Sequence, residues 1–214
     1  LLERSGNWKN LFDKESRFLR GKDRAGNFRA TFDPYEWGGD NCEGSSWQNS
    51  FAVYHDIDGL ALAHGSKREL EERLDELFAA EAKFSVGAYG QEIHEMSEMA
   101  SADFGQCAIS NQPSFHLPWI YTLLGKRKKT EFWVKKLAGE AFFCTADGFP
   151  GDEDNGTTAC WYLFACLGFY PLCPGKAKYV ASAPLFEKIT VCGKEIGRFS
   201  EELIDHKKIC GGEI

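Results

Sequence analysis

The chain has 214 residues, a formal net charge of −7, and 43% hydrophobic and 14% aromatic residues, a composition typical of a folded globular protein. The acidic balance argues against a nucleic-acid-binding surface, because the longest basic run is only Lys126–Lys129. No stretch approaches the roughly 18 apolar residues of a membrane-spanning helix. The chain begins at Leu1 with neither Met nor a signal peptide, and we expect it to be cut from a longer polypeptide.

The eight cysteines include no C-x-x-C pair, which argues against a zinc ribbon and a thioredoxin-like motif. Most of them lie in apolar stretches such as 159–161 and 165–167. We therefore expect buried free thiols rather than disulfides. Cysteine usage alone does not decide the cellular compartment.

Apolar residues recur at helical spacing over most of the chain before Pro171. The expected helical segments are 1–20, 46–61, 67–80, 114–124, 129–143 and 157–169. Ser66 and Glu69 form a capping-box pattern at the start of the third segment. The last segment is apolar nearly all round, which predicts a deeply buried helix.

The other segments are expected to be connections or strands. Residues 21–31 predict a loop or a short hairpin, and residues 32–44 and 84–113 predict two long connections. Connections of this length are usually functional. Beyond Pro171 the pattern changes, and residues 178–192 predict short strands. The sequence thus predicts a mainly α fold, with long loops at one end of the helices, followed by short β strands.

The most informative stretch is the acidic loop Gly151–Gly156, in which three consecutive acids stand between two glycines. Like charges this close repel one another, so a fold retains them mainly where a cation or a reaction requires them. Carboxylate oxygens suit a hard cation, and a carboxylate pair suits general acid/base catalysis. A solvated acidic turn is the third interpretation, and these residues alone do not decide among the three.

Three further clusters carry groups that could take part in chemistry. Glu43 precedes Trp47 at a helix start, where an acid also favours the positive end of the helix dipole. His55 and Asp56 lie within a predicted helix, where an isolated His is more often a core residue than a ligand. The run His94–Met99 resembles a zincin helix but lacks the second His of H-E-x-x-H, which argues against a zinc protease.

A carboxylate pair such as Glu43 and Asp154 permits glycoside hydrolysis if one group is protonated and the other ionised. Several runs then resemble the bacterial exo-α-mannosidases of glycoside hydrolase family 92, in order and with similar spacing from about residue 30 to about residue 190. These runs are Phe32–Pro34, Glu43–Gln48, Val53–Asp56, Gly59–Leu60, His94–Met96, Ser110–Pro113, Gly151–Gly156, Trp161–Tyr162 and Leu167–Pro171.

The resemblance implies that residues 1–174 are the C-terminal part of an (α/α)6 helical barrel and that residues 175–214 are a β-strand appendage. It also implies an N-terminal β-sandwich domain in the parent chain and one bound calcium ion. Family members act on α-mannosides of glycans with inversion, and they are typically exported to the periplasm or the cell surface. An inverting pair of carboxyl groups lies roughly 6.5–9.5 Å apart.

The residues that match the family's motifs are expected to have the roles that those motifs have in the family. Glu43 would be the general acid, and Asp154, assisted by Asp152, would be the base that activates water. His94 and Glu95 match the pair that shapes the leaving-group subsite in members acting on α-1,2 linkages. The expected sugar contacts are Asp33, Trp47, His55 and Asp56, and the expected calcium ligands are Glu98, Asn111, Gln112 and the acidic loop.

The chain departs from the family pattern at one motif: where many members have His-Gly-Asn-Glu-Pro, residues 109–113 read Ile-Ser-Asn-Gln-Pro. Because Gln112 stands where those members have Glu, this chain has one negative charge fewer near the proposed metal. Two rival hypotheses remain at this point. One is a non-catalytic carbohydrate-binding segment that retains the mannose and calcium site, and the other is a different (α/α)6 hydrolase acting on glucosides.

Overall fold

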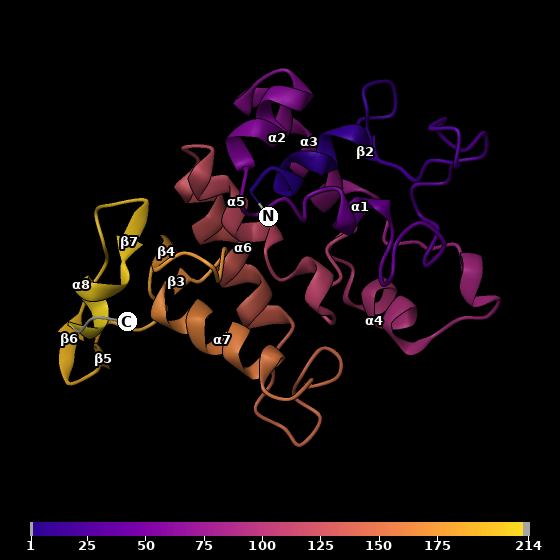
Figure 1. Cartoon of the computed structure of the whole chain (residues 1–214). Helices are drawn as coiled ribbons and strands as arrows, with labels where there is room; N and C mark the ends of the chain where they lie inside the picture. The colour runs from indigo at the N-terminus through magenta and orange to yellow at the C-terminus, as the bar shows by residue number, and fades with distance from the viewer. Residues whose placement is uncertain (1, 212–214) are drawn as a thin grey trace. The chain divides into compact units, whose positions relative to one another are not determined.

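The computed structural model describes residues 2–211 and shows a mainly helical chain with small antiparallel sheets (Figure 1). This confirms the predicted combination of helices with short strands. The chain divides into two compact units, Leu1–Ala108 and Ile109–Ile214. Among the described residues, no helix is long and apolar enough to cross a membrane.

The first unit contains short strands, 3₁₀ turns and helices (Figure 1). In chain order these are η1 (Arg4–Asn10), β1 (Phe12–Asp13), β2 (Phe18–Leu19), α1 (Ser46–Asn49), α2 (Ile57–His64), α3 (Lys67–Ala79), η2 (Gly87–Tyr89) and α4 (His94–Ala102). Strands β1 and β2 form an antiparallel pair, and α2 packs against α3.

Helix α3 forms where the sequence predicts it. The Ser66 side chain accepts a hydrogen bond from the Glu69 backbone N–H, which satisfies a donor that the first helical turn leaves unpaired. Leu70, Leu74 and Leu77 follow at helical spacing and are fully buried. The amphipathic pattern and the cap therefore determine this helix together.

Three expectations for the first unit are corrected. Residues 1–20 are not one helix, because the Asp13 carboxylate binds the backbone N–H groups of Glu15 and Ser16 and thereby forms the β1–β2 turn. Segment 46–61 is interrupted, since Asp56 caps a new helix by accepting from the Gly59 N–H.

The third correction concerns connection 84–113, which contains helix α4. Met96 and Met99 on this helix are fully buried in a cluster with Trp37 and Ala108. The apolar partners that stabilise α4 thus include a residue far away in sequence, which local spacing does not reveal.

The second unit contains helices followed by two small sheets (Figure 1). Its elements are η3 (Gln112–Ser114), α5 (Leu117–Leu123), α6 (Arg127–Glu140), α7 (Thr157–Leu167), β3 (Phe169–Tyr170), β4 (Lys178–Ala181), β5 (Ile189–Val191), β6 (Lys194–Ile196), β7 (Leu203–Asp205) and α8 (His206–Cys210). The strand order is β3-β4-β7 in one antiparallel sheet and β5-β6 in the other. The strands expected within 178–192 are confirmed.

Helix α7 corrects the expectation of a helix buried on all sides. Trp161 and Ala165 are buried, but Leu163 is 55% exposed and Tyr162 is 38% exposed. The buried face is fixed by Trp161, whose indole N–H donates to the Phe115 carbonyl over 2.9 Å and whose ring stacks on Phe142. One face of α7 therefore packs in this unit, and its apolar composition does not imply burial all round.

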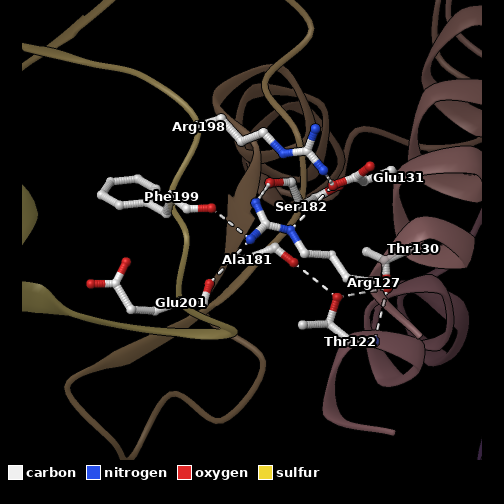
Figure 2. Close-up of polar contacts among 9 residues, drawn as sticks. All are labelled: Thr122, Arg127, Thr130, Glu131, Ala181, Ser182, Arg198, Phe199 and Glu201. Atoms are coloured by element: carbon white, nitrogen blue, oxygen red, sulfur yellow. Dashed lines mark hydrogen bonds and ion pairs between the residues drawn. The ribbon is translucent and has the colours of Figure 1, made fainter. Parts of the chain in front are cut away.

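Arg127, in the first turn of α6, connects that helix to the C-terminal sheet region (Figure 2). Its guanidinium donates to the carbonyls of Phe199, Ser182 and Glu201 at 2.6, 2.5 and 3.3 Å. Glu131, one turn later, forms ion pairs with both Arg127 and Arg198. A single side chain thus satisfies three carbonyls of the irregular backbone around the strands.

A buried pair of threonines makes a second connection to β4 (Figure 2). Thr122 Oγ1 lies 2.9 Å from both the Ala181 carbonyl oxygen and Thr130 Oγ1. Because a carbonyl can only accept, Thr122 donates to Ala181 and Thr130 donates to Thr122. Thr130 in turn accepts from the Thr122 backbone N–H. Both hydroxyl groups of this pair therefore donate and accept hydrogen bonds that connect α5, α6 and β4.

The burial expected for the cysteines is corrected by the structure. All eight are free thiols, but only Cys107 and Cys166 are buried. Cys160 is exposed on α7, although its neighbours in sequence are apolar. The expected burial of Cys160 is wrong for the same reason as the expected burial of α7 on all sides. Neighbouring residues in a helix point to different faces, so apolar neighbours do not bury Cys160.

Candidate functional site

The acidic loop leads into helix α7 on a left-handed backbone. Asp154 and Asn155 have φ values of 56° each, and Gly156 has a φ of 96°. The left-handed region costs roughly 1–2 kcal/mol for most residues with a side chain, and Asp and Asn adopt it more readily than the others. Such conformations persist where the surrounding structure enforces them, and they cluster at functional sites.

Two threonines at the start of α7 hold this backbone in place. Thr157 Oγ1 donates to the Asp154 carbonyl and Thr158 Oγ1 to the Asp152 carbonyl, each over 2.8 Å. Thr158 is fully buried, so its hydrogen bond is shielded from water. The first turn of α7 thus fixes the main chain of both acids.

The three acids have different roles. Glu153 folds back on the loop, and its Oε2 accepts a hydrogen bond from the Gly156 N–H over 2.7 Å. We therefore assign Glu153 to the structure of the turn. The side chains of Asp152, which is exposed, and Asp154, which is half-buried, remain the candidates for chemistry.

Asp154 is joined by one of the predicted metal ligands, Gln112. The Gln112 Nε2 donates to Asp154 Oδ2 over 2.8 Å. Asn111 fixes the start of η3, because its side-chain oxygen accepts from the Gln112 backbone N–H over 2.8 Å. The structure therefore brings together Asn111, Gln112 and Asp154 within the second unit.

This arrangement rests on buried packing beneath it. The Trp161–Phe115 hydrogen bond joins α7 to the segment between η3 and α5. Trp161 is 1% exposed and Phe115 is 3% exposed. The two elements that carry Asp154 and Gln112 are thus attached to one another by a rigid, water-excluded contact.

In the first unit, Glu43 is exposed at the end of a rigid turn. Its carbonyl accepts from Asn49 Nδ2 over 2.6 Å, and Ser45 begins α1 with a reciprocal capping box to Gln48. Gln48 is fully buried and also donates to the Gln106 carbonyl over 2.7 Å. These contacts fix the backbone from which the Glu43 carboxylate projects.

Tyr89 is a neighbour of Glu43 that the sequence did not single out. Its hydroxyl donates to the Cys42 carbonyl over 3.0 Å. The pKa of Tyr89 is raised, first by desolvation and then by the negative charges of Glu43 and Glu95. The tertiary structure alone brings Tyr89 close to these acids, since a lone tyrosine in a short 3₁₀ turn carries no sequence signal.

Helix α4 aligns His94 with two acids. His94 Nδ1 lies 2.9 Å from Glu98 Oε1, and His94 Nε2 lies 3.5 Å from Glu95 Oε1. The second carboxylate oxygens, Glu95 Oε2 and Glu98 Oε2, are buried without a hydrogen-bond partner. Buried carboxylate oxygens without a donor are costly, so a substrate hydroxyl or a cation would stabilise them.

The four expected sugar contacts have structural partners in the first unit. Asp33 accepts from the Tyr35 N–H and from Ser85 Oγ, which fastens its turn. Trp47 is 6% exposed and packs edge-on against Phe18. These contacts fix the position of both side chains, and their roles toward a sugar stay predictions.

The other two sugar-contact candidates surround the start of α2. His55 Nε2 lies 2.8 Å from the Ser5 carbonyl. Asp56 caps α2 and forms an ion pair with Lys9 at 3.7 Å. Their roles toward a sugar likewise stay predictions.

The predicted calcium ligands are Glu98, Asn111, Gln112 and the acidic loop. Within residues 2–211, no group of three or more His, Cys, Asp or Glu side chains is placed to hold a metal ion. The predicted ligands nevertheless have suitable chemistry, because amide and carboxylate oxygens suit a hard cation. The buried, unpartnered Glu98 Oε2 is an atom that a cation would satisfy. The calcium ligands stay a prediction.

Comparison with known proteins identifies the family of the chain. Residues 1–200 match the glycosyl hydrolase family 92 catalytic domain. The chain belongs to glycosyl hydrolase family 92. Its resemblance to that family is thereby confirmed.

Relatives of this family 92 chain include solved and curated proteins. A family GH92 α-mannosidase from Bacteroides thetaiotaomicron in complex with mannoimidazole superposes with a TM-score of 0.84 at 26% identity, covering 98% of this chain and 30% of that one. A family GH92 inverting mannosidase from the same organism gives 0.78 at 32% identity, with 98% and 32% covered. An uncharacterized secreted glycosidase from Arthroderma benhamiae is 25% identical, with 88% of this chain and 24% of the relative covered. The chain thus spans about a quarter to a third of the length of these relatives.

Proposed function

We propose that this family 92 chain carries catalytic residues of an inverting exo-α-mannosidase that removes terminal mannose from glycans. The observation that supports this most directly is the loop at 152–156, where a left-handed backbone and a hydrogen bond from Gln112 orient Asp154. Its family membership and its similarity to α-mannosidases, one of them named as inverting, support the same reaction.

In this mechanism Glu43 protonates the departing glycosidic oxygen. Asp154, assisted by Asp152, removes a proton from the water that attacks the anomeric carbon from the opposite face of the ring. Gln112 supports the base by donating to Oδ2, which leaves Oδ1 of Asp154 available for the water. His94 and Glu95 would contact the leaving-group sugar, and the natural linkage would be α-1,2.

Glu98, Asn111 and Gln112, together with the acidic loop, would hold a calcium ion. When bound, calcium would polarise and orient hydroxyl groups of the sugar. Asp33, Trp47, His55 and Asp56 would complete the contacts to the mannose ring from the first unit.

The proposal extends to the architecture and the location of the parent protein. Residues 1–174 would belong to an (α/α)6 barrel and residues 175–214 to a β appendage, with a β-sandwich domain on the N-terminal side. The secreted relative supports export to the periplasm, the cell surface or the medium.

The experiment is release of free mannose from α-1,2-linked mannobiose by the parent protein, with and without a calcium chelator. We expect release that the chelator lowers and that added calcium restores. The anomer first released should be inverted when it is followed by NMR. Release from an α-1,3-linked or α-1,6-linked substrate alone would refute the α-1,2 assignment while leaving the reaction class intact.

Substitution Glu43→Gln separates an enzyme from a binding module. A variant without the acid should lose turnover of mannobiose by roughly 10²–10⁴-fold while it still binds mannose. Glu187→Gln, a change at a surface position, is the matched control. Mannose binding by a wild-type parent protein that releases no sugar from any α-mannoside would favour the non-catalytic carbohydrate-binding alternative.

A further inference from the structure

The turn of the β5–β6 hairpin contains a cysteine in an unusual backbone conformation. Cys192 and Gly193 link the two strands with φ values of 51° and 74°. A two-residue hairpin turn with both φ values positive strongly favours Asn, Asp or Gly at its first position. A cysteine there carries a conformational cost, and residues held in such conformations cluster at functional sites.

A second cysteine is presented by the end of helix α8. Cys210 is the last residue of α8, and Gly211 ends the helix with a φ of 73°. The preceding residue, Ile209, is 1% exposed and belongs to the same apolar cluster as Ile189 and Ile196 of the hairpin. This shared core fixes the end of α8 against the β5–β6 hairpin.

The two sulfur atoms consequently lie next to one another. Cys192 Sγ lies 3.3 Å from Cys210 Sγ. A disulfide bond is about 2.05 Å long, so the two sulfur atoms would approach by roughly 1.3 Å when the bond forms. Cys192 is exposed and Cys210 is half-buried, which makes Cys192 the thiol that an oxidant meets first.

We propose that Cys192 and Cys210 form a disulfide that ties the β5–β6 hairpin to the end of α8. With a small-molecule disulfide such as oxidised glutathione as the oxidant, the Cys192 thiolate attacks one sulfur and releases the first glutathione thiol. The Cys210 thiolate then attacks Cys192 Sγ in the mixed disulfide and releases the second. The protein loses two protons and two electrons, which the two glutathione thiols carry away.

This cross-link is placed where the fold needs it. A two-stranded hairpin is marginally stable by itself, and here Ile189 and Ile196 attach it to an apolar cluster that also contains Phe169, Ile204 and Ile209. A disulfide across it removes freedom from the unfolded chain and stabilises the native arrangement. Oxidising compartments, in which secreted proteins fold, retain such bonds.

The test is peptide mapping of the parent protein after equilibration with oxidised glutathione or with a reductant. Free thiols are alkylated before tryptic digestion without reduction. We expect the oxidised sample to contain peptide 189–194 linked to the peptide that begins at Ile209, and the reduced sample to contain both in alkylated form. Separate alkylated peptides in the oxidised sample would overturn the proposal, as would linkage of either cysteine to a different one.

A thermal measurement adds a second readout. Reduction should lower the Tm of the wild-type protein and leave the Tm of Cys192→Ser unchanged. Cys144→Ser, which removes an exposed thiol elsewhere in the second unit, should respond to reduction as the wild type does. An equal response of Cys192→Ser and the wild type would contradict a stabilising bond. Peptide mapping of the wild type needs no variant, so it decides the question even if a variant does not fold.

Discussion

The acidic loop shows how three adjacent carboxylates are given different roles by their hydrogen bonds. Glu153 binds the backbone of its own turn, whereas Asp154 receives a side-chain donor from η3. Charge repulsion alone would treat these neighbours alike. The positive φ values of Asp154, Asn155 and Gly156 shape the turn that Glu153 closes through the Gly156 N–H.

This division predicts unequal effects of conservative changes. Glu153→Gln keeps an oxygen acceptor for the Gly156 N–H, so the proposed mannosidase activity should stay close to that of the wild type. Asp154→Asn removes the proposed base and should lower kcat by roughly 10²–10⁴-fold. Asp147→Asn, at an exposed position of the preceding connection, is the control. Equal losses for Glu153→Gln and Asp154→Asn would show that the loop acts only as a charged unit.

A second prediction concerns the donor to Asp154. Gln112→Leu removes one hydrogen bond to a charged group, worth about 1.5–3 kcal/mol, so kcat should fall roughly 10- to 100-fold. Because the contact orients Asp154, the proposed base, the loss should appear in kcat more than in KM.

A double-mutant cycle provides the control for Gln112. In an Asp154→Asn background, Gln112→Leu should cause little further loss, since the orientation of the base no longer matters. An undiminished effect of Gln112→Leu in that background would show that Gln112 acts on the reaction by another route.

At the scale of elements, Arg127 has more influence than its place in a basic run suggests. Its guanidinium binds three backbone carbonyls of the C-terminal region from the first turn of α6 (Figure 2). A fork of fixed donors can satisfy several carbonyls at once, which a lysine ammonium on a flexible stem cannot reproduce.

Arg127→Met should therefore lower the free energy of unfolding by about 1–3 kcal/mol, because it leaves carbonyls of the sheet region without a donor. Arg127→Lys should restore only part of this loss. The matched control is Lys128→Met, which removes a neighbouring exposed charge and should change stability little. Thermal or urea unfolding measures the difference, and equal stabilities of Arg127→Met and Lys128→Met would contradict it.

At the scale of the whole molecule, a buried histidine makes stability depend on pH. His64 is 8% exposed, and its pKa is lowered to about 4, first by burial and then by the positive charges of Arg73 and Arg17. In the unfolded chain the histidine has its ordinary pKa of about 6.5. The unfolded state thus binds more protons between these two values, and stability rises with pH across that window.

The free energy of unfolding should accordingly fall as the pH is lowered from about 6.5 to about 4, by up to about 3 kcal/mol from this group. His64→Phe should flatten the pH dependence in this window, because the variant has no group at this position that takes up a proton between pH 6.5 and pH 4. Unfolding at pH 8 is the reference, because the histidine is neutral there in both states. If the free energy of unfolding of His64→Phe depends on pH as steeply as that of the wild type, the dependence arises from other groups.

The sequence by itself determined the local elements whose signals lie within a few residues. Helix α3 follows from its cap and its leucine spacing, and the strands within 178–192 follow from their β-branched residues and breakers. The ordered set of motifs from Phe32 to Pro171 was sufficient for the family, since catalytic groups depend on residue type and spacing. Glu43, Asp152 and Asp154 were identified in this way as candidates.

Only the tertiary structure decided which groups meet and which faces are covered. The Gln112–Asp154 hydrogen bond joins residues 42 positions apart, and the Cys192–Cys210 contact joins residues 18 apart. Helix α4 depends on Trp37, and the exposed face of α7 depends on which of its residues find partners. Composition reports how apolar or acidic a segment is, but burial and hydrogen bonding are properties of pairs, and distant pairs form only when the chain has folded.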